Sequence, residues 1–263
     1  MLLKRVFAVI VIVLATIAFL ANVAGLVGVW VVRKPARETV TTLSTLVNDK
    51  LGKLNDALGR VGFRADEGRQ AVARINNAAS QVGDRVENNG PMVTTLINAT
   101  RDDLAPKIVK LRAQAGALRD ATVSVNAALE TFNSLEVVTV PTFSEELSAV
   151  SARIDAIQED VEDLRAKIDE MRSGASANLV TAVKTRTDRI DNVIGQIQST
   201  AAKYQGLALQ KRKQVADRAQ KIVHTINLLA LSLTALFLLV AAGQVLLIYV
   251  VGRSMITAGR ISA

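Results

Sequence analysis

The side chains that most often carry out chemistry in proteins are scarce in this sequence. The chain has no cysteine, which excludes disulfides, thiolate metal sites and cysteine nucleophiles. Its one histidine, His224, stands at the start of a long apolar run, and the only hydroxyl beside it belongs to Thr225. A catalytic or metal-bound imidazole needs an acid, a nucleophile or further ligands within reach. We therefore interpret His224 as a residue at the edge of the apolar run.

Two pairs of neighbouring acids are the other candidates for acid–base catalysis or metal binding. They are Asp102–Asp103 and Glu145–Glu146, and each pair lies in a segment with a helical pattern. Adjacent residues on a helix point in different directions, so a solvated face explains both pairs. The sequence has no glycine-rich phosphate loop, and its basic residues are interleaved with acids and lack aromatic partners, unlike a nucleic-acid surface. We predict a non-enzymatic protein with no catalytic, cofactor or metal site, no small-molecule substrate and no nucleic-acid partner.

Two long apolar runs lie near the ends of the chain. From Val6 to Val32, and again from Ile222 to Gly252, the sequence contains no aspartate, glutamate, lysine or arginine. Roughly 20 apolar residues span a bilayer, so both runs are long enough to cross it with some tilt. We predict transmembrane helices over 6–32 and 223–251, between short basic tails at 1–5 and 252–263. A cleaved signal peptide is the alternative for the first run.

The charges that flank the two runs favour opposite orientations in a membrane. Lys4 and Arg5 precede the first run and favour a cytoplasmic N-terminus. Five basic residues precede the second run and favour the other side, namely Lys211, Arg212, Lys213, Arg218 and Lys221. Because the first span usually dominates, we expect an integral protein of the plasma membrane with cytoplasmic termini and residues 33–222 outside the cytoplasm. The five basic residues are candidates for contact with anionic lipid headgroups, and the alternative is a solvated helix face.

Between the runs, residues 33–222 repeat apolar or small residues at steps of three and four, as coiled coils and helical bundles do. The pattern runs from Val47 to Val86, Val93 to Phe132, Phe143 to Met171 and Val183 to Ala208, with two successive four-residue steps near Pro106. Glycine, proline and serine indicate breaks near 88–91, 134–142 and 173–176. The predicted fold class is an all-α membrane protein, with two transmembrane helices flanking a long antiparallel coiled-coil or four-helix-bundle domain.

The break at 88–91 decides between two shapes for this domain. Its sequence, Asn-Asn-Gly-Pro, can either reverse the chain into a compact bundle or kink one long helix of an extended hairpin. Helices over 37–88, 92–134, 143–172 and 177–222 would be about 78, 65, 45 and 69 Å long, and an up-down-up-down bundle of them closes within about 11 Å. The bundle also sets an acidic third segment beside a basic fourth. We favour the bundle and keep the hairpin as the alternative.

The loop after the second helical segment is unusually apolar. Its sequence, "SLEVVTVPTF" at 134–143, carries Val137, Val138, Val140 and Phe143 where solvated residues are expected. These four residues are candidates for contact with a partner protein or with the membrane. The alternative is that they close the end of the bundle, with Phe132 and Phe143 over its core.

Together these patterns predict a scaffold or accessory subunit that spaces or assembles protein partners at a membrane. The expected partners are membrane lipids and either further copies of the chain or other membrane proteins. The layout of two spans around a helical domain also resembles the ligand-binding half of bacterial chemoreceptors and sensor kinases, which makes a sensory module the alternative. Those receptors continue into a long output domain, whereas 12 residues follow the second span here, in "GRSMITAGRISA". A sensory role would therefore need a separate signalling partner.

Overall fold

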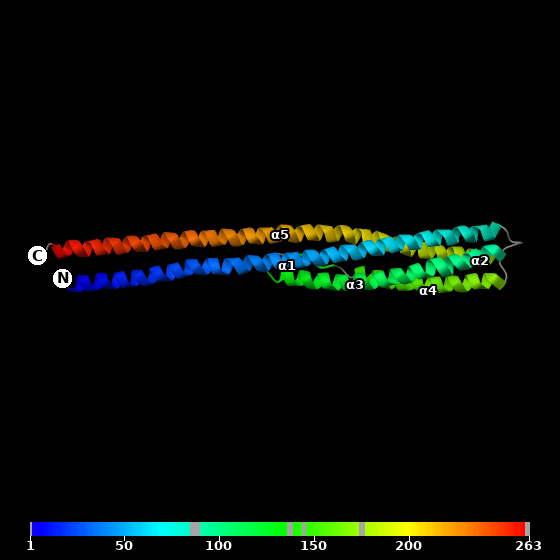
Figure 1. Cartoon of the computed structure of the whole chain (residues 1–263), viewed down its shortest axis with the longest axis horizontal. Helices are drawn as coiled ribbons and strands as arrows, with labels where there is room; N and C mark the ends of the chain where they lie inside the picture. The colour runs from blue at the N-terminus through cyan, green and yellow to red at the C-terminus, as the bar shows by residue number, and fades with distance from the viewer. Residues whose placement is uncertain (1, 85–89, 136–138, 144–145, 174–176, 261–263) are drawn as a thin grey trace. The chain divides into compact units, whose positions relative to one another are not determined.

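The protein is all-helical over the residues that the structure describes. The computed structural model describes residues 2–84, 90–135, 139–143, 146–173 and 177–260, and within these ranges it contains helices and no strand. The prediction of an all-α chain is therefore confirmed. The helices, shown in Figure 1, are α1 (Leu2–Asp84), α2 (Gly90–Asn98), the π-helix η1 (Ala99–Leu104), α3 (Ala105–Asn133), α4 (Glu146–Ser173) and α5 (Ala177–Arg260).

Contacts divide the chain into two compact units, and α1 and α5 contribute to both. Unit 1 consists of Met1–Thr42 and Asp217–Ala263, and unit 2 of Leu43–Ala216. Unit 2 holds most of the region that the sequence predicts as a bundle. The boundaries predicted at 33 and 222 concern the edge of a membrane, and they stay predictions.

Unit 2 packs four helical segments in which neighbours run in opposite directions. The segments are the unit 2 part of α1, the run from α2 through η1 to α3, then α4, and the unit 2 part of α5. Side-chain pairs join them in a ring: Arg60 with Gln114, Arg112 with Asp155, Asp160 with Arg186, and Asp191 with Arg69. The packing of this unit is bundle-like, and it places the acidic α4 beside the basic part of α5.

The chain reverses direction between α1 and α2. Helix α1 ends at Asp84 and α2 begins at Gly90, while residues 85–89 lie outside the described ranges. Arg74 of α1 forms an ion pair with Asp103 of η1, with 3.1 Å between Nη2 and Oδ2. A continuous helix, rising about 1.5 Å per residue, would carry these two residues far apart. The contacts of unit 2 therefore support the folded-back alternative over the extended hairpin.

The apolar pattern of the sequence forms the core of unit 2. The described members of its first stretch are all buried, namely Val47, Leu51, Leu54, Leu58, Val61, Ala65, Gly68, Val72, Ile75, Ala79 and Val82. Val86, the last member, lies outside the described residues. Gly68 allows close packing there, because a Cβ at this position would lie 3.2 Å from Cδ1 of Ile194. Burial of these aliphatic side chains away from water is the main force that packs the helices of such a unit together.

A π-helix changes the predicted pattern between α2 and α3. The sequence pattern predicts Ile97 in the core, whereas the structure buries Leu96 and leaves Ile97 half-buried. Pro106 has no N–H to donate to the carbonyl of Asp102, and the wider turns of η1 directly precede it. The irregularity expected near Pro106 thus takes the form of a π-helix, which absorbs the successive four-residue steps of the core positions Leu96, Thr100, Leu104 and Ile108.

Unit 1 pairs the terminal parts of α1 and α5 side by side in opposite directions. Three pairs of side chains join them: Asn22 with Gln244, Trp30 with Thr234, and Arg33 with Asn227. The first residues of α1 and the last residues of α5 consequently lie at the same end of this unit, as Figure 1 shows. Large apolar side chains point outward here, and those of Leu20 and Leu239 are 61% and 72% exposed. Both helices are long and apolar enough to cross a membrane.

Candidate functional site

The apolar loop between α3 and α4 turns part of its apolar surface inward. Val140 is fully buried and Phe143 is 6% exposed, and Phe132 at the end of α3 is buried as well. This placement agrees with the alternative in which the loop closes the end of the core. Val137 and Val138 lie outside the described residues, so a partner or membrane contact by this loop stays a prediction that rests on those two side chains.

Two asparagines of α3 hold the backbone of this loop. Asn133 accepts a hydrogen bond from the N–H of Val140 at 2.7 Å and donates to its carbonyl at 2.9 Å. Asn126 pairs with Phe143 in the same way, at 2.8 and 3.3 Å. Each side-chain amide thus replaces the partner that a backbone group would have in a regular element. Sequence reasoning missed both residues, because an asparagine within a helical pattern does not reveal which backbone it will meet.

Lys211 of α5 also belongs to this loop rather than to a free basic surface. Its ammonium group donates a hydrogen bond to the carbonyl of Pro141 and lies 5.0 Å from the centre of the Phe143 ring. Partial burial lowers the pKa of Lys211 below its ordinary value of 10.5, since desolvation disfavours the charged form. The Phe143 ring in turn lies 6.2 Å from that of Tyr204. Lys211 is therefore less available to anionic lipids than the exposed Arg212, Lys213 and Lys221.

The other four basic residues of that prediction are divided between the two units. Arg212 and Lys213 are exposed in unit 2, whereas Arg218 is half-buried and Lys221 exposed in unit 1. Lys221 lines a shallow groove of about 570 Å³ together with Asp217 and His224. The contact of these residues with lipid stays a prediction.

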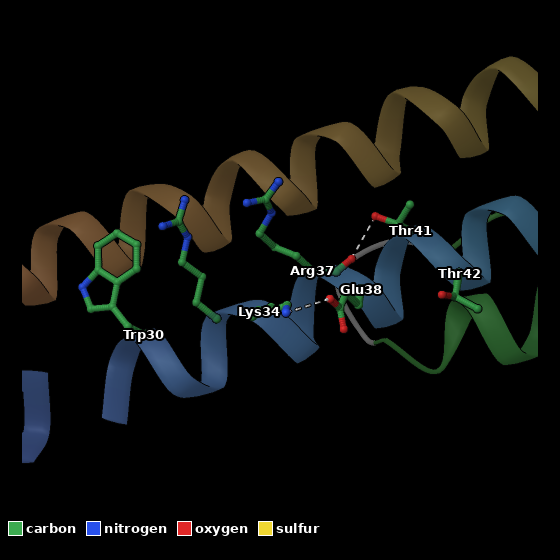
Figure 2. Close-up of a pocket in the computed structure, with 7 residues that line it drawn as sticks. Trp30, Lys34, Arg37, Glu38, Thr41 and Thr42 are labelled. Atoms are coloured by element: carbon green, nitrogen blue, oxygen red, sulfur yellow. Dashed lines mark hydrogen bonds and ion pairs between the residues drawn. The ribbon is translucent and has the colours of Figure 1, made fainter. Parts of the chain in front are cut away.

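A larger groove in unit 1, which we call the Trp30 groove, gathers basic side chains that sequence reasoning had not considered as a binding site. It has a volume of about 620 Å³ and is lined by Trp30, Arg33, Lys34, Arg37, Glu38, Thr41 and Thr42. Figure 2 shows Trp30 and Arg37 projecting from α1 towards α5, with Lys34 and Glu38 beside them. Spacings of three and four residues along α1 place these residues on neighbouring turns. That spacing is the sequence feature by which the groove could have been recognised.

Polar groups of α5 fix two of the side chains in the Trp30 groove. Both Nε and Nη2 of Arg33 donate to Oδ1 of Asn227, at 3.0 and 2.8 Å. The indole N–H of Trp30 donates to Oγ1 of Thr234 at 3.1 Å. The Arg33 guanidinium also lies 4.5 Å from the centre of the Trp30 ring, which is within the range of a cation–π interaction. Trp30 and Arg33 are therefore held in position without any acidic residue.

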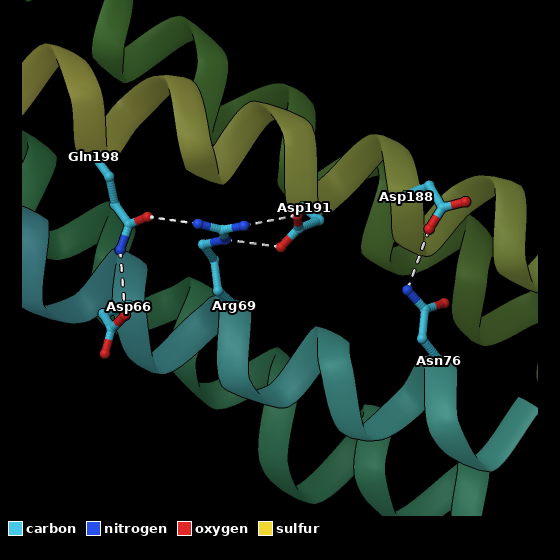
Figure 3. A network of polar contacts seen from close by, with 6 residues as sticks. All are labelled: Asp66, Arg69, Asn76, Asp188, Asp191 and Gln198. Carbon is cyan, nitrogen blue, oxygen red and sulfur yellow. Dashed lines mark hydrogen bonds and ion pairs between the residues drawn. The ribbon is translucent and has the colours of Figure 1, made fainter.

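Unit 2 joins α1 to α5 through a different, charged network, which Figure 3 shows. Arg69 forms a bidentate ion pair with Asp191, at 2.9 and 3.1 Å, and this pair raises the pKa of Arg69. One turn or more away, Asn76 donates to Asp188 at 3.2 Å, and Gln198 bridges Arg69 to Asp66. The network holds one arginine and three aspartates, and its hydrogen bonds join α1 to α5 at several successive levels, so it is suited to fixing the register of the two helices.

A second charged cluster joins α4 to α5. The carboxylate of Asp160 is only 4% exposed and is paired with Arg186 at 3.0 Å and with Arg189 at 3.1 Å. Arg186 also reaches Asp163 at 2.9 Å. In the described part of the chain, no group of three or more histidines, aspartates or glutamates is arranged to hold a metal ion. The Asp160 cluster is thus a link between helices.

No family model, no curated protein and no solved structure matches this chain. Its function is therefore inferred from the residues described above.

Proposed function

We propose that this chain is a membrane-anchored, non-enzymatic helical scaffold that holds protein partners at a bilayer. The observation that carries the proposal concerns α1 and α5. Each is a single helix, of 83 and 84 residues, that includes an apolar span and continues into unit 2. Pro35 inside α1 removes one backbone hydrogen bond, but no loop separates either span from the bundle-like unit, so helix alone joins them. A scaffold that holds partners at a bilayer needs a firm link between its membrane spans and its partner-binding unit. It needs no catalytic residue.

The proposal also includes the arrangement of the two units at the membrane. Unit 2 would be a four-helix bundle outside the cytoplasm, and the two apolar helices would cross the plasma membrane side by side. The antiparallel pairing of Asn22 with Gln244 and of Arg33 with Asn227 supports the placement of both termini on one side. Protease added outside intact cells should then cut within 33–222 and leave tags on both termini intact. Protection of 33–222 would reverse the orientation.

Unit 2 offers a surface that suits a protein partner. The Phe63 side chain is 60% exposed, and the Arg64 guanidinium lies 5.4 Å from the centre of its ring. Phe63 and Arg64 line a groove of about 410 Å³ with Arg60 and Gln114. Aromatic residues and arginines dominate the binding energy of protein interfaces. The partner would be another copy of this chain or another membrane protein.

Native mass spectrometry of the gently solubilised protein tests this function. The expected result is an assembly heavier than the 28.1 kDa chain. Phe63→Ala should dissociate the assembly, while Val123→Ala, which truncates a side chain that is 63% exposed on α3, should leave it intact. Recovery of the native protein only as a monomer, in several mild detergents, would sink the proposal.

The continuity of the same two helices favours a sensory module as the second candidate. No loop interrupts α1 or α5, so a shift of one helix against the other can be transmitted along them. Such a module would act with a separate signalling protein. A cysteine pair at Asn22 and Gln244 would distinguish the two functions, because its crosslinking rate should change on stimulation of a sensor and stay constant in a static scaffold.

A further inference from the structure

The Trp30 groove has an unbalanced positive charge. Arg33, Lys34 and Arg37 line it together with one carboxylate, that of Glu38. Glu38 lies 4.0 Å from Lys34, and both side chains are more than half exposed, so their attraction is weak. Among the described residues, no acidic side chain pairs with Arg33 or Arg37. The groove therefore retains cationic groups that are available to an anion.

Two side chains of the groove, those of Trp30 and Arg33, are already held in place by other residues of the protein. Asn227 holds Arg33 through two donors, and Thr234 holds the indole of Trp30. Arg37 stands one helical turn beyond Arg33, and Figure 2 shows it projecting towards α5, as Trp30 does. Residues four apart on a helix have their Cβ atoms about 6 Å apart, so one phosphate can contact both guanidinium groups. Arginine suits phosphate because its planar donors match the phosphate oxygens.

The groove also begins where the apolar surface of α1 ends. Val31 and Val32 are 64% and 65% exposed, and Arg33 follows directly. Tryptophan is enriched at the level of lipid headgroups, because its ring is apolar and its N–H is polar. The groove volume, about 620 Å³, lies in the range that small ligands occupy in proteins. An anionic headgroup at this level would have its acyl chains beside the exposed apolar side chains of unit 1.

We propose that the Trp30 groove binds the phosphate of an anionic glycerophospholipid, with Arg33 and Arg37 as its main ligands. Lys34 adds charge at the rim, and Trp30 packs against the glycerol and upper acyl region. The inference rests on the proposed membrane insertion of unit 1. It places the lipid site on α1, whereas the basic residues that precede the second apolar run on α5 include Lys211, which is already engaged by the α3–α4 loop.

The single tryptophan of the chain makes the test direct, because Trp30 lies in the groove itself. The full-length protein is reconstituted into phosphatidylcholine bilayers that contain a minor fraction of phosphatidylglycerol, and one of the two lipids carries brominated acyl chains that quench tryptophan. Brominated phosphatidylglycerol should quench Trp30 more strongly than its share of the bilayer predicts. Quenching in proportion to that share would overturn the proposal.

Matched variants separate the groove from general positive charge. Lys34→Gln with Arg37→Gln should abolish the preference, with a loss of up to about fivefold per charge, equivalent to roughly 1 kcal/mol. Arg212→Gln with Lys213→Gln removes the same charge from exposed positions on α5 and should retain the preference. Equal losses in the two variants would contradict a specific site. Asn227→Leu, which frees Arg33, should weaken the preference while every cation remains.

Two further outcomes separate the lipid site from the membrane insertion of unit 1, on which it depends. Failure of both brominated lipids to quench Trp30 would show that unit 1 is not in the bilayer, and the proposed function would fail with it. Quenching by brominated phosphatidylcholine without any preference for phosphatidylglycerol would leave the insertion intact and remove only the lipid site. A change in Trp30 emission caused by inorganic phosphate in pure phosphatidylcholine bilayers, and absent in chloride of equal ionic strength, would overturn the assignment to a lipid.

Discussion

Helices α1 and α5 contact each other in both units, but the chemistry of the contact is opposite in the two. In unit 2 the side chains that face inward are aliphatic, such as Leu54 and Ile194, and the charged pairs lie around them. In unit 1 many large aliphatic side chains face outward, although Val40, Ile222 and Ala230 are buried, and amide, hydroxyl and guanidinium groups join the helices. The same two helices are therefore joined by an aliphatic core in unit 2 and mainly by polar side chains in unit 1.

The proposed insertion of unit 1 into a membrane accounts for this difference. In water, burial of aliphatic side chains drives helices together, and polar groups at the rim add register. In hydrocarbon, leucine gains nothing by leaving lipid for protein, so small residues and hydrogen bonds have to carry the association. Gly25 fits this reading, since a Cβ there would lie 2.8 Å from the Phe237 ring. The comparison predicts which substitutions matter in each unit.

The largest effect is expected from truncation of a leucine in the core of unit 2. Leu54→Ala should lower the free energy of unfolding by about 2–5 kcal/mol, because Leu54 is fully buried and the cavity cannot collapse completely. Leu20→Ala is the matched change in unit 1, where the side chain is 61% exposed, and it should cost less than about 0.5 kcal/mol. Denaturant unfolding in detergent, followed by circular dichroism, measures both. Similar costs would remove the contrast between the units.

Charged pairs of unit 2 should differ by their burial. Arg186→Ala should cost about 1–3 kcal/mol, because it takes one partner from the buried carboxylate of Asp160. Lys53→Ala breaks an exposed pair with Asp49 within α1 and should cost much less, because solvent screens the attraction between exposed charges. The same unfolding assay compares them. If the two variants were equally stable, the Asp160 cluster would not be a link between helices.

A polar pair in unit 1 should show measurable coupling. Asn22 donates to Gln244 at 2.9 Å between two apolar helices. Asn22→Leu and Gln244→Leu each leave one amide unpaired, so the double variant should be more stable than the sum of the single effects predicts, by about 0.6 kcal/mol. Titration with SDS in mixed micelles measures this double-mutant cycle. Additive effects would indicate that the hydrogen bond contributes nothing to the pairing.

The smallest effect concerns the pH dependence of unit 2. The folded-state pKa of Lys211 is lowered, so between that value and 10.5 the unfolded chain binds the proton that the folded chain has lost. Stability contributed by this group should therefore rise with pH across that window. In Lys211→Met the rise should disappear, while the exposed control Lys213→Met should keep it. Thermal unfolding at a series of alkaline pH values would detect the difference, and a decrease with pH would contradict the sign.

The core of unit 2 could be predicted from the sequence because it depends only on the period of apolar residues. The stretch from Val47 to Val82 needs no knowledge of its partners to be recognised as a buried face. The burial of Leu96 in place of Ile97 could not be predicted in the same way. The four-residue steps near Pro106 indicate an irregularity, but they do not show that the backbone forms a π-helix there or which residue it turns into the core.

In the Trp30 groove the residues themselves could be recognised from the sequence, but the contacts that hold them could not. Its residues all lie on α1, and the spacing of Trp30, Arg33 and Arg37 is visible in the sequence. What makes the groove a site is the anchoring of Arg33 by Asn227 and of Trp30 by Thr234. Those contacts join residues 194 and 204 positions apart in the sequence and depend on the register between the two helices, which an apolar pattern alone leaves open.

The two asparagines that hold the α3–α4 loop have a consequence for how this chain can be altered. Asn126 and Asn133 stand two helical turns apart, and they fix Val140 and Phe143 at a set separation. Pro141 and Thr142 lie between these anchors with exposed side chains. New side chains at Thr142 should therefore be accepted, whereas one added residue between the anchors should release one of them. The loop is permissive in composition and strict in length.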